Sequence, residues 1–536
     1  MVYLVIGLVI LVVGGFLYGK FVEKQFGPDD NRPTPAFAKQ DGVDFVPMKS
    51  WKNTLINLLN IAGTGPVLGP IQGILFGPIA FLTIPIGCVL AGAMHDYFNG
   101  MIATRNGGAQ MPRIVTKYLG NKVKGLYLVF SSILLLLVGV VFVYTPGDLI
   151  VGDILGKSTA ASNWVVWVVY AAIFLYYVAA TVFPIDQIIG RIYPVFGAFL
   201  IVSAIGVLIG VFVDGGANLH NIEGLLFTMV KNDQGKLVQS LPLKEFVGGF
   251  VGHLDGSPFI PVFFITVACG ILSGFHGSQT ALIGRTIEKE SQGRHIFYTS
   301  MIMEGAIAMA WAAGAMVLFN MAKANPAATG VEDALLSGAA LNHNATNMVG
   351  VISRQFMGNI GGLLAIIGVI VLPITSGDTA FRALRLQIAE RFHIDQKPYG
   401  KRMGLAIALF IPALAILVFA KTNANGFNIL WRYFGFANQA LAVFSLGMTS
   451  IYLAVHKKNY WIAFIPMLFY TFIVFSFILH ANIGFNLDTL LGLSTADNPH
   501  NYTASYIGGA IITALYGWFI WNRMHNAKED LLTYEV

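Results

Sequence analysis

Glycines and prolines interrupt an apolar region of the chain at residues 57–73, where the sequence reads NLLNIAGTGPVLGPIQG. Each proline removes a backbone donor and clashes with the preceding helical turn, and each glycine weakens a helix further. A broken helix in hydrocarbon leaves amides and carbonyls that are costly unless protein or water satisfies them. We therefore expect this stretch to line a polar site, as the discontinuous helices of secondary transporters do. A kink packed by neighbouring helices is the alternative.

Most of the remaining chain is apolar enough to cross a bilayer. Of the 536 residues, 56% are hydrophobic and 11% are charged, against about 25% charged in soluble domains. Since a span needs about 20 apolar residues, the sequence predicts an all-α polytopic membrane protein with about 13 transmembrane helices. The two cysteines, Cys88 and Cys269, fall inside predicted spans, so we expect no disulfide framework.

The distribution of lysine and arginine predicts the orientation of the chain. The first 19 residues are apolar and are followed by Lys20 and Lys24, which is typical of a retained span rather than a cleaved signal. If the N-terminus lies outside, the inner segments carry 25 Lys and Arg residues and the outer segments carry 6. Basic loops stay in the cytoplasm, so we expect an outside N-terminus and a cytoplasmic C-terminus. The net charge of +6 therefore indicates topology and no nucleic-acid partner.

A second interruption, SGFHGSQT at residues 273–280, predicts an internal repeat. It opens a second set of five spans, and because five is odd this set must be inverted relative to the first. We expect a five-plus-five inverted repeat with two discontinuous helices, plus one N-terminal and two C-terminal extra helices. The expected domains are an N-terminal span and loop (1–50), a first repeat (51–213), an extracellular loop (214–257), a second repeat (258–455) and C-terminal spans with a tail (456–536).

The two interruptions supply the candidate substrate-binding residues. A half-helix starting near Ser278 would direct its free N–H groups toward an anion, whereas a single satisfied core histidine at His276 is the alternative. The candidates are Asn60, Gly63, Thr64 and Gly65 from the first break, and Ser273, Gly274, His276, Gly277, Ser278 and Gln279 from the second.

Polar residues in GAMHDYFNG (92–100) are candidates for ion coupling, because ionisable groups inside spans are costly. Asp96 and Asn99 share a helix face, and histidine titrates near neutrality. Either His95 or Asp96 could therefore carry a coupling proton. Since this motif lies toward the inner end of its span, a cytoplasmic anchor is the alternative.

A second ion-coupling candidate is LPITSGDTAFRALRLQ (372–387), where Thr375, Ser376 and Asp378 lie near the inner end of the eighth span counted from the first break. Oxygens of Thr375, Ser376 and Asp378 could join carbonyls of the first break around a cation, since hard ions prefer oxygen ligands. A helix C-terminus followed by basic anchors is the alternative. Neither motif is a metal signature, so we expect no bound metal and no cofactor. Arg432 is expected to be an interfacial, snorkelling arginine rather than a substrate ligand.

At four of these motifs the sequence resembles the carbon starvation protein A family. The matching stretches are GTGPVLGPIQG, AMHDYFNGMIATRNGG, ILSGFHGSQTALI and PITSGDTAFRALR, and the resemblance covers most of residues 50–455. It implies uptake of small nutrients, peptides or pyruvate, across the bacterial inner membrane with proton coupling. The chain departs from long family members by a reduced region after about residue 455.

The expected function is a secondary active transporter that imports a small, pyruvate-like carboxylate by symport with a proton or cation. A peptide would also need an acid for its amine, and the buried acids are few, namely Asp96, Asp378, Asp186 and Glu304. Short-peptide uptake is nevertheless the alternative within the family. Two other classes are an intramembrane enzyme using His95 and Asp96 and a passive channel. Adjacent helical residues do not supply a catalytic geometry, and the sequence contains no repeated carbonyl filter.

Overall fold

The computed structural model describes residues 2–182, 185–214, 227–231, 237–242, 256–324, 338–396, 398–423, 426–495, 498–526 and 529–532. Within them, nine helices are long and apolar enough to cross a membrane, and one bent pair brings the number to ten. Two shorter apolar helices, Trp164–Ala180 and Gly197–Val213, and a second broken segment at 259–283 complete thirteen. The protein is therefore an all-α, multi-pass membrane protein, as the sequence predicts.

The N-terminal half contains one extra span and the first five-span set. The extra span is α1 (Val2–Val9), η1 (Ile10–Gly14) and α2 (Gly15–Phe26), followed by the short α3 (Pro35–Ala38). The set comprises α4 (Ser50–Ile61) with α5 (Gly65–Gly73) and η2 (Ile74–Phe76); α6 (Ala80–Gly87) with η3 (Cys88–Gly92) and α7 (Ala93–Arg105); α9 (Asn121–Leu149) with η4 (Ile150–Ile154); α10 (Trp164–Val182); and α11 (Ile185–Asp214). Helix α8 (Met111–Leu119) joins α7 to α9.

The C-terminal half repeats this order and adds two spans. The second set comprises η7 (Phe259–Phe263), α12 (Phe264–Thr266), α13 (Ala268–Ile271) and α14 (Gly274–Ile283); η8 (Glu290–Gln292), η9 (Arg294–Tyr298) and α15 (Thr299–Ala324); α18 (Gly338–Phe392); α19 (Tyr399–Thr422); and α20 (Gly426–Val455). The extra spans are α21 (Trp461–His480) and α23 (Thr503–His525), with α22 (Leu487–Leu490) between them and η10 (Glu529–Leu532) at the end. Both five-span sets thus open on a broken helix.

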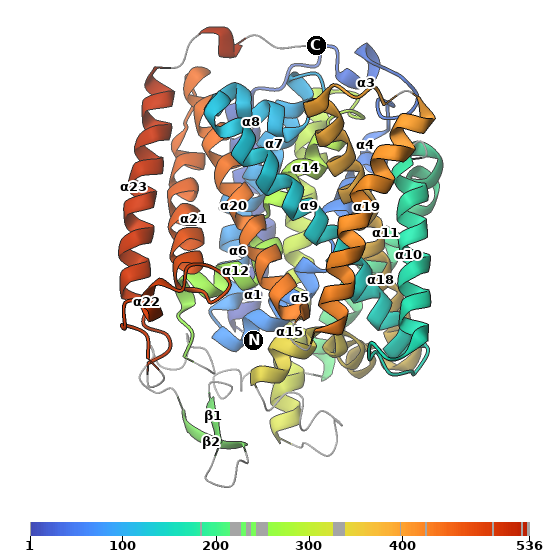
Figure 1. The fold of residues 1–536 in the computed structure, drawn as a ribbon, viewed down its shortest axis with the longest axis vertical. Coiled ribbons are helices and arrows are strands. Elements are labelled where there is room, and N and C mark those ends of the chain that lie inside the picture. Colours follow the sequence, from blue (N-terminus) through green and yellow to red (C-terminus); the bar gives the residue numbers. More distant parts are fainter. Residues whose placement is uncertain are drawn as a thin grey trace.

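The helices run side by side along the long axis of the bundle (Figure 1). Helix α18 packs along α9 and α11, and α21 and α23 pack together beside α20 at one side. Helix α1 begins at the lower end of the view and α23 ends at the upper end, as an odd number of spans requires (Figure 1). Of the predicted extracellular loop 214–257, the structure describes little beyond the antiparallel pair β1 (Phe227–Lys231) and β2 (Leu237–Pro242).

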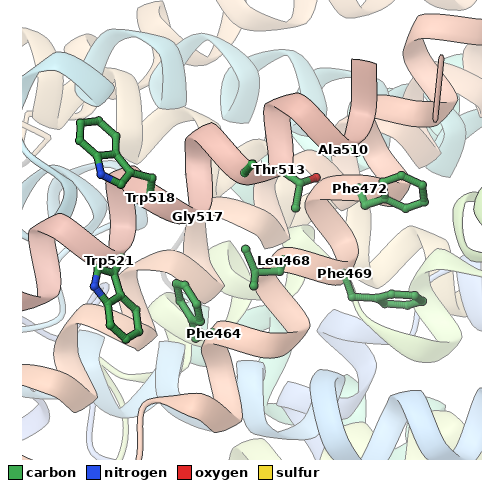
Figure 2. Close-up of a pocket in the computed structure, with 10 residues that line it drawn as sticks. Phe464, Leu468, Phe469, Phe472, Ala510, Thr513, Gly517, Trp518 and Trp521 are labelled. Carbon is green, nitrogen blue, oxygen red and sulfur yellow. The ribbon is translucent and has the colours of Figure 1, made fainter. Parts of the chain in front are cut away.

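An apolar groove of about 660 Å³ runs between α21 and α23 on the outer surface, where the two helices pack together (Figure 2). Aromatic side chains line it from both helices, and Trp518 is 68% exposed. A surface of this composition suits the hydrocarbon of a bilayer, where exposed apolar side chains carry no penalty. The groove is therefore part of the lipid-facing surface and lies apart from the polar residues described below.

Asp488 of α22 ties the loop between α21 and α23 to the start of α23. Its carboxylate accepts hydrogen bonds from the backbone N–H of Ala504 at 2.7 Å, from the hydroxyl of Ser505 and from Nδ1 of His480 at 3.0 Å. Burial opposes ionisation of this carboxyl, but these hydrogen bonds hold its pKa below its usual range. The charge also lies at a helix N-terminus, where an anion is favourable.

We expect Asp488→Asn to lower the thermal stability of the protein at neutral pH but not in acid. Because the pKa is depressed in the folded state, ionised Asp488 stabilises the protein above the unfolded-state pKa of about 3.9. That contribution is lost as the pH falls through the lower, folded-state pKa. The melting temperatures of the variant and the wild type should therefore differ at pH 7 and converge below about pH 4. A constant difference across this range would contradict the assignment.

Candidate functional site

Both predicted breaks are present. Helix α4 ends at Ile61 and α5 begins at Gly65, and the two axes differ by 51°. Helix α13 ends at Ile271, the backbone at the next two residues is extended, and α14 begins at Gly274. The prediction of two discontinuous helices is confirmed.

The two broken spans lie against each other. Helix α5 contacts α13, and α4 contacts α14. A methyl group on Gly65 would overlap the side chain of Cys269, and one on Gly69 would lie 2.8 Å from the carbonyl oxygen of Thr266. Glycine at these positions lets the spans touch through their backbones. Segments about 200 residues apart in sequence therefore form one layer of buried, partly irregular backbone.

The start of α14 corrects the sequence prediction. The half-helix begins at Gly274 rather than near Ser278, and Asn438 of α20 caps it. The side-chain oxygen of Asn438 accepts hydrogen bonds from the hydroxyl of Ser273 at 3.0 Å and from the N–H of Phe275 at 2.8 Å. The cap satisfies one of the backbone donors that a free helix N-terminus would offer to an anion. The N-terminus of α14 therefore offers fewer donors to a substrate carboxylate than the sequence predicts.

We expect Asn438→Ala to destabilise the folded protein by about 1 kcal/mol, the usual cost of losing a capping side chain. The variant leaves two donors of the second break without their acceptor. Denaturant unfolding of the purified protein measures the loss. Asn526→Ala, at an exposed position after α23, is the matched control and should unfold like the wild type.

A chain of buried ionisable side chains crosses between the two repeats. His95 and Asp96 lie on α7, His276 on α14 and Glu304 on α15, and none of the four side chains is exposed. Asp96 accepts from Nδ1 of His95 at 2.8 Å and from Nδ1 of His276 at 2.9 Å. The other nitrogen of His276, Nε2, lies 3.4 Å from the carboxylate of Glu304. Four titratable groups thus form one line: His95, Asp96, His276, Glu304.

Hydrogen bonding assigns different parts to the two histidines. The amide nitrogen of Asn99 lies 2.9 Å from Nε2 of His95, and in this orientation of the amide Nε2 accepts while Nδ1 donates to Asp96. His95 and His276 then both donate to Asp96, which is an acceptor on both oxygens. Only the 3.4 Å contact between His276 and Glu304 is open to holding or losing a proton.

Several polar side chains around this line have no hydrogen-bond partner among the described residues. They are both polar atoms of Asn60, the hydroxyl of Thr64, both polar atoms of Gln279 and both oxygens of Glu304. All four residues are fully buried. The backbone of Ile61, at the end of α4, is a further polar neighbour of His276. Unsatisfied buried polar groups are costly and uncommon in folded proteins, and they cluster where water, an ion or a ligand binds.

The TSGDT motif lies inside α18, which continues to Phe392, so the alternative interpretation of this motif as a helix C-terminus is wrong. Proline 373 does not end the helix, because neighbouring helices can satisfy the freed backbone groups. The hydroxyl of Ser376 donates to the carbonyl of Leu59 in α4 at 2.8 Å, so this residue reaches the first break. Thr375 bonds to its own helix, and Asp378 accepts from the hydroxyl of Tyr176 at 2.7 Å.

Of the remaining candidates, some lie beside the line of ionisable residues and others pack against neighbouring helices. Gly277 lies beside Asn99, and a methyl group there would be 3.2 Å from the Asn99 amide nitrogen. Gly63 packs against Phe142, and Ser278 accepts from Gln387 of α18 at 3.3 Å. Arg432 is exposed, and the side chain of Asp186 lies outside the described residues.

Glu304 and Asn438 are the members of the site that the sequence did not place in it. From the sequence, Glu304 is only one of few acids within the spans. A signal for Asn438 exists in FANQAL (436–441), where two adjacent amides interrupt an apolar span. Within the described ranges, no three His, Cys, Asp or Glu residues are arranged to hold a metal ion.

Known proteins resemble this chain in sequence and in fold. The family described as carbon starvation protein CstA matches residues 1–232, 238–351 and 337–476. An uncharacterized membrane protein of Haemophilus influenzae is 42% identical over 364 residues, which cover 62% of this chain and 93% of the relative. Peptide transporter CstA of Campylobacter jejuni and that of Escherichia coli are each 24% identical. These matches cover 87% and 84% of this chain and 78% and 76% of the relatives.

Solved structures share the architecture at low sequence identity. A manganese transporter of Eremococcus coleocola, crystallised with an aromatic bis-isothiourea substituted compound, aligns with a TM-score of 0.52 at 11% identity. The alignment covers 91% of this chain and 99% of that chain. At this identity the likeness concerns the fold, which is the five-plus-five inverted repeat of membrane transporters.

Proposed function

Because this chain belongs to the carbon starvation protein CstA family, we propose that it imports a small, pyruvate-like carboxylate together with protons. Membrane transport itself follows from the family and the fold, and the relatives with functional names are transporters rather than enzymes. The bacterial inner membrane, an outside N-terminus and a cytoplasmic C-terminus are part of the proposal. They are supported by the excess of Lys and Arg in the inner segments.

The observation that carries the proposal is the line of buried ionisable groups between the two broken helices. His276 donates to Asp96 with one nitrogen and faces Glu304 with the other. A proton at this 3.4 Å contact lies either on His276, which makes the two groups an ion pair, or on Glu304, which leaves both groups neutral. Buried acids and histidines of this kind form the proton relays of membrane pumps and transporters. The pair is thus suited to pick up one proton on one side and release it on the other.

The unpartnered amides and hydroxyl of the two broken helices favour a carboxylate as the substrate. The amides of Asn60 and Gln279 and the hydroxyl of Thr64 are neutral donors, and a carboxylate needs donors without a balancing acid. A peptide also carries an ammonium group, which needs an acceptor carboxylate. Both oxygens of Asp96 are occupied by histidines and Glu304 faces His276. Short-peptide uptake, which the names of the relatives suggest, is the second candidate.

All of these side chains are buried, so a substrate reaches them only when the helices around the breaks move. This is the expected behaviour of an inverted-repeat transporter, in which one repeat or bundle moves relative to the other around a fixed site. The third candidate, coupling to a cation at the first break, is less favoured because the hydroxyl of Ser376 and the carbonyl of Leu59 already bind each other.

Uptake into proteoliposomes tests the proposal. The purified full-length protein is reconstituted, and labelled pyruvate uptake is measured with and without an inwardly directed proton gradient. We expect uphill accumulation only with the gradient, and no dependence on sodium. Pyruvate flux that is indifferent to the gradient would refute proton coupling. Saturable, gradient-driven uptake of dialanine but not of pyruvate would support the peptide alternative.

A further inference from the structure

A cluster of arginines lies at the end of the bundle that carries α3 and α8 (Figure 1), beyond the last residues of α14. Arg285 follows α14, Arg382 and Arg385 lie on the last turns of α18, and Arg402 lies on the first turn of α19. Arg385 is fully buried, and Arg285 and Arg382 are 8% and 2% exposed. Arginines that only fix membrane topology remain at the surface, as Arg391 does on the same helix.

Among the described residues, the cluster is short of negative charge. Arg382, Arg402 and Arg285 all lie close enough to repel Arg385, and Asp44 is the described carboxylate that acts on it. Asp44 is 3.6 Å from Arg382 and also acts on Arg285. Glu390 and Asp41 act on Arg285 as well, but Glu390 also pairs with Arg113 at 3.5 Å. Buried charges in proteins are normally paired, because an uncompensated ion in a low-dielectric site is strongly unfavourable.

Guanidinium donors in the cluster are also without acceptors. The Nε and one terminal nitrogen of Arg385, and the Nε of Arg402, have no hydrogen-bond partner among the described residues. The other terminal nitrogen of Arg385 donates to the side-chain oxygen of Gln396. Arg285 donates to the carbonyl of Gly108 at 2.8 Å and lies over the ring of Phe45. These contacts hold the arginines in place without neutralising them.

A groove of about 510 Å³ opens beside the cluster. Arg285, Phe45 and Gln396 line it together with Lys39 and Arg113, and the acids Glu390 and Asp395 lie on its wall. It connects the end of α18 with the turn between α7 and α8. A small anion that entered this groove would meet Arg285 directly and Arg385 behind Gln396.

We propose that this groove is a second binding site, which takes a small oxyanion such as a carboxylate or phosphate. Planar guanidinium groups bind the paired oxygens of such anions with charge-assisted hydrogen bonds. The anion would supply the missing negative charge and the missing acceptors at once. A soluble carboxylate or phosphate and the phosphate of an acidic lipid headgroup share this chemistry. The site stands independently of which solute the central residues transport.

Anion binding to the full-length protein tests the site. In nanodiscs of phosphatidylcholine, pyruvate and inorganic phosphate are titrated by calorimetry into the wild type, Arg385→Gln, Arg402→Gln and the exposed control Arg391→Gln. Arg385→Gln removes a buried positive charge behind the groove wall and should weaken anion binding by about tenfold. Arg402→Gln, at a partly buried position, should weaken it less, and Arg391→Gln, at an exposed position, should match the wild type.

Two further measurements distinguish a soluble anion from a lipid headgroup, and this groove from the central site. Nanodiscs that contain phosphatidylglycerol should bind the soluble anion as tightly as before if the occupant is a solute, and more weakly if the headgroup competes for the arginines. Glu304→Gln should leave phosphate affinity unchanged, which separates this site from the central one. The proposal is overturned if neither anion binds saturably in phosphatidylcholine, or if Arg385→Gln and Arg391→Gln bind the anions equally well.

Discussion

Glu304→Gln should abolish the accumulation of substrate on a proton gradient while leaving substrate exchange intact. Glutamine has nearly the shape of glutamate and its amide can donate to Nε2 of His276, so the variant keeps the buried contact that now measures 3.4 Å. It cannot take up or release a proton, and His276 is then held neutral by its new donor. The empty and loaded carriers would still interconvert, but no proton would travel with the substrate.

The measurement compares two modes of transport in the same proteoliposomes. Uphill pyruvate uptake driven by an inward proton gradient should fall to the level of protein-free vesicles, whereas counterflow of labelled against unlabelled pyruvate should persist. Glu288→Gln makes the same chemical change in the partly exposed turn after α14 and should accumulate pyruvate normally. If Glu304→Gln concentrates pyruvate as well as the wild type does, the coupling proton is not held between His276 and Glu304.

The breaks themselves were predictable because their cause is local. Proline and glycine act on the turn in which they stand, so GTGPVLGPIQG and SGFHGSQT disclose interrupted helices without any knowledge of their neighbours. The five-span interval between them then fixes the inverted repeat by counting alone. The structure describes both breaks at the predicted places, within a few residues.

The pairing of ionisable groups was not predictable, because it depends on packing between distant segments. His276 lies 180 residues after Asp96 in the chain, and the two meet only because α14 packs against α7. The sequence placed His95 and Asp96 in an ion-coupling group and His276 in a substrate-binding group, whereas the geometry joins all three with Glu304. Adjacent residues on a helix point in different directions, yet His95 turns back to donate to its neighbour.

Errors in helix ends have the same origin. The start of α14 lies four residues earlier than expected, since Asn438 from α20 supplies a cap that no residue near Ser273 encodes. The TSGDT motif looked like the end of a span because it follows Pro373 and precedes basic residues. In the folded protein α18 continues beyond it, which places Ser376 at the first break and Arg385 in the arginine cluster.

Gly274→Ala should strongly destabilise the protein and should also block transport. A methyl group at Gly274 would overlap the carbonyl oxygen of Asn438 and lie 2.5 Å from the backbone nitrogen of Ala442 and 2.6 Å from Cβ of Leu441. Two of these atoms belong to the backbone of α20, so no rotamer change relieves the clash. Overpacking of this kind costs about 1–3 kcal/mol or more, and here the strain would move α14 away from its cap.

The control is Gly404→Ala in α19, where an added methyl group meets nothing within 4 Å. Alanine is favoured over glycine inside a helix by roughly 0.5–1 kcal/mol, so this variant should be as stable as the wild type or slightly more so. Denaturant unfolding and gradient-driven uptake are measured on both. Because α14 carries His276, a displaced α14 would separate this residue from Asp96 and Glu304, and uptake should fail even in the fraction that folds. Equal stability and equal uptake in the two variants would show that α14 does not need its close contact with α20.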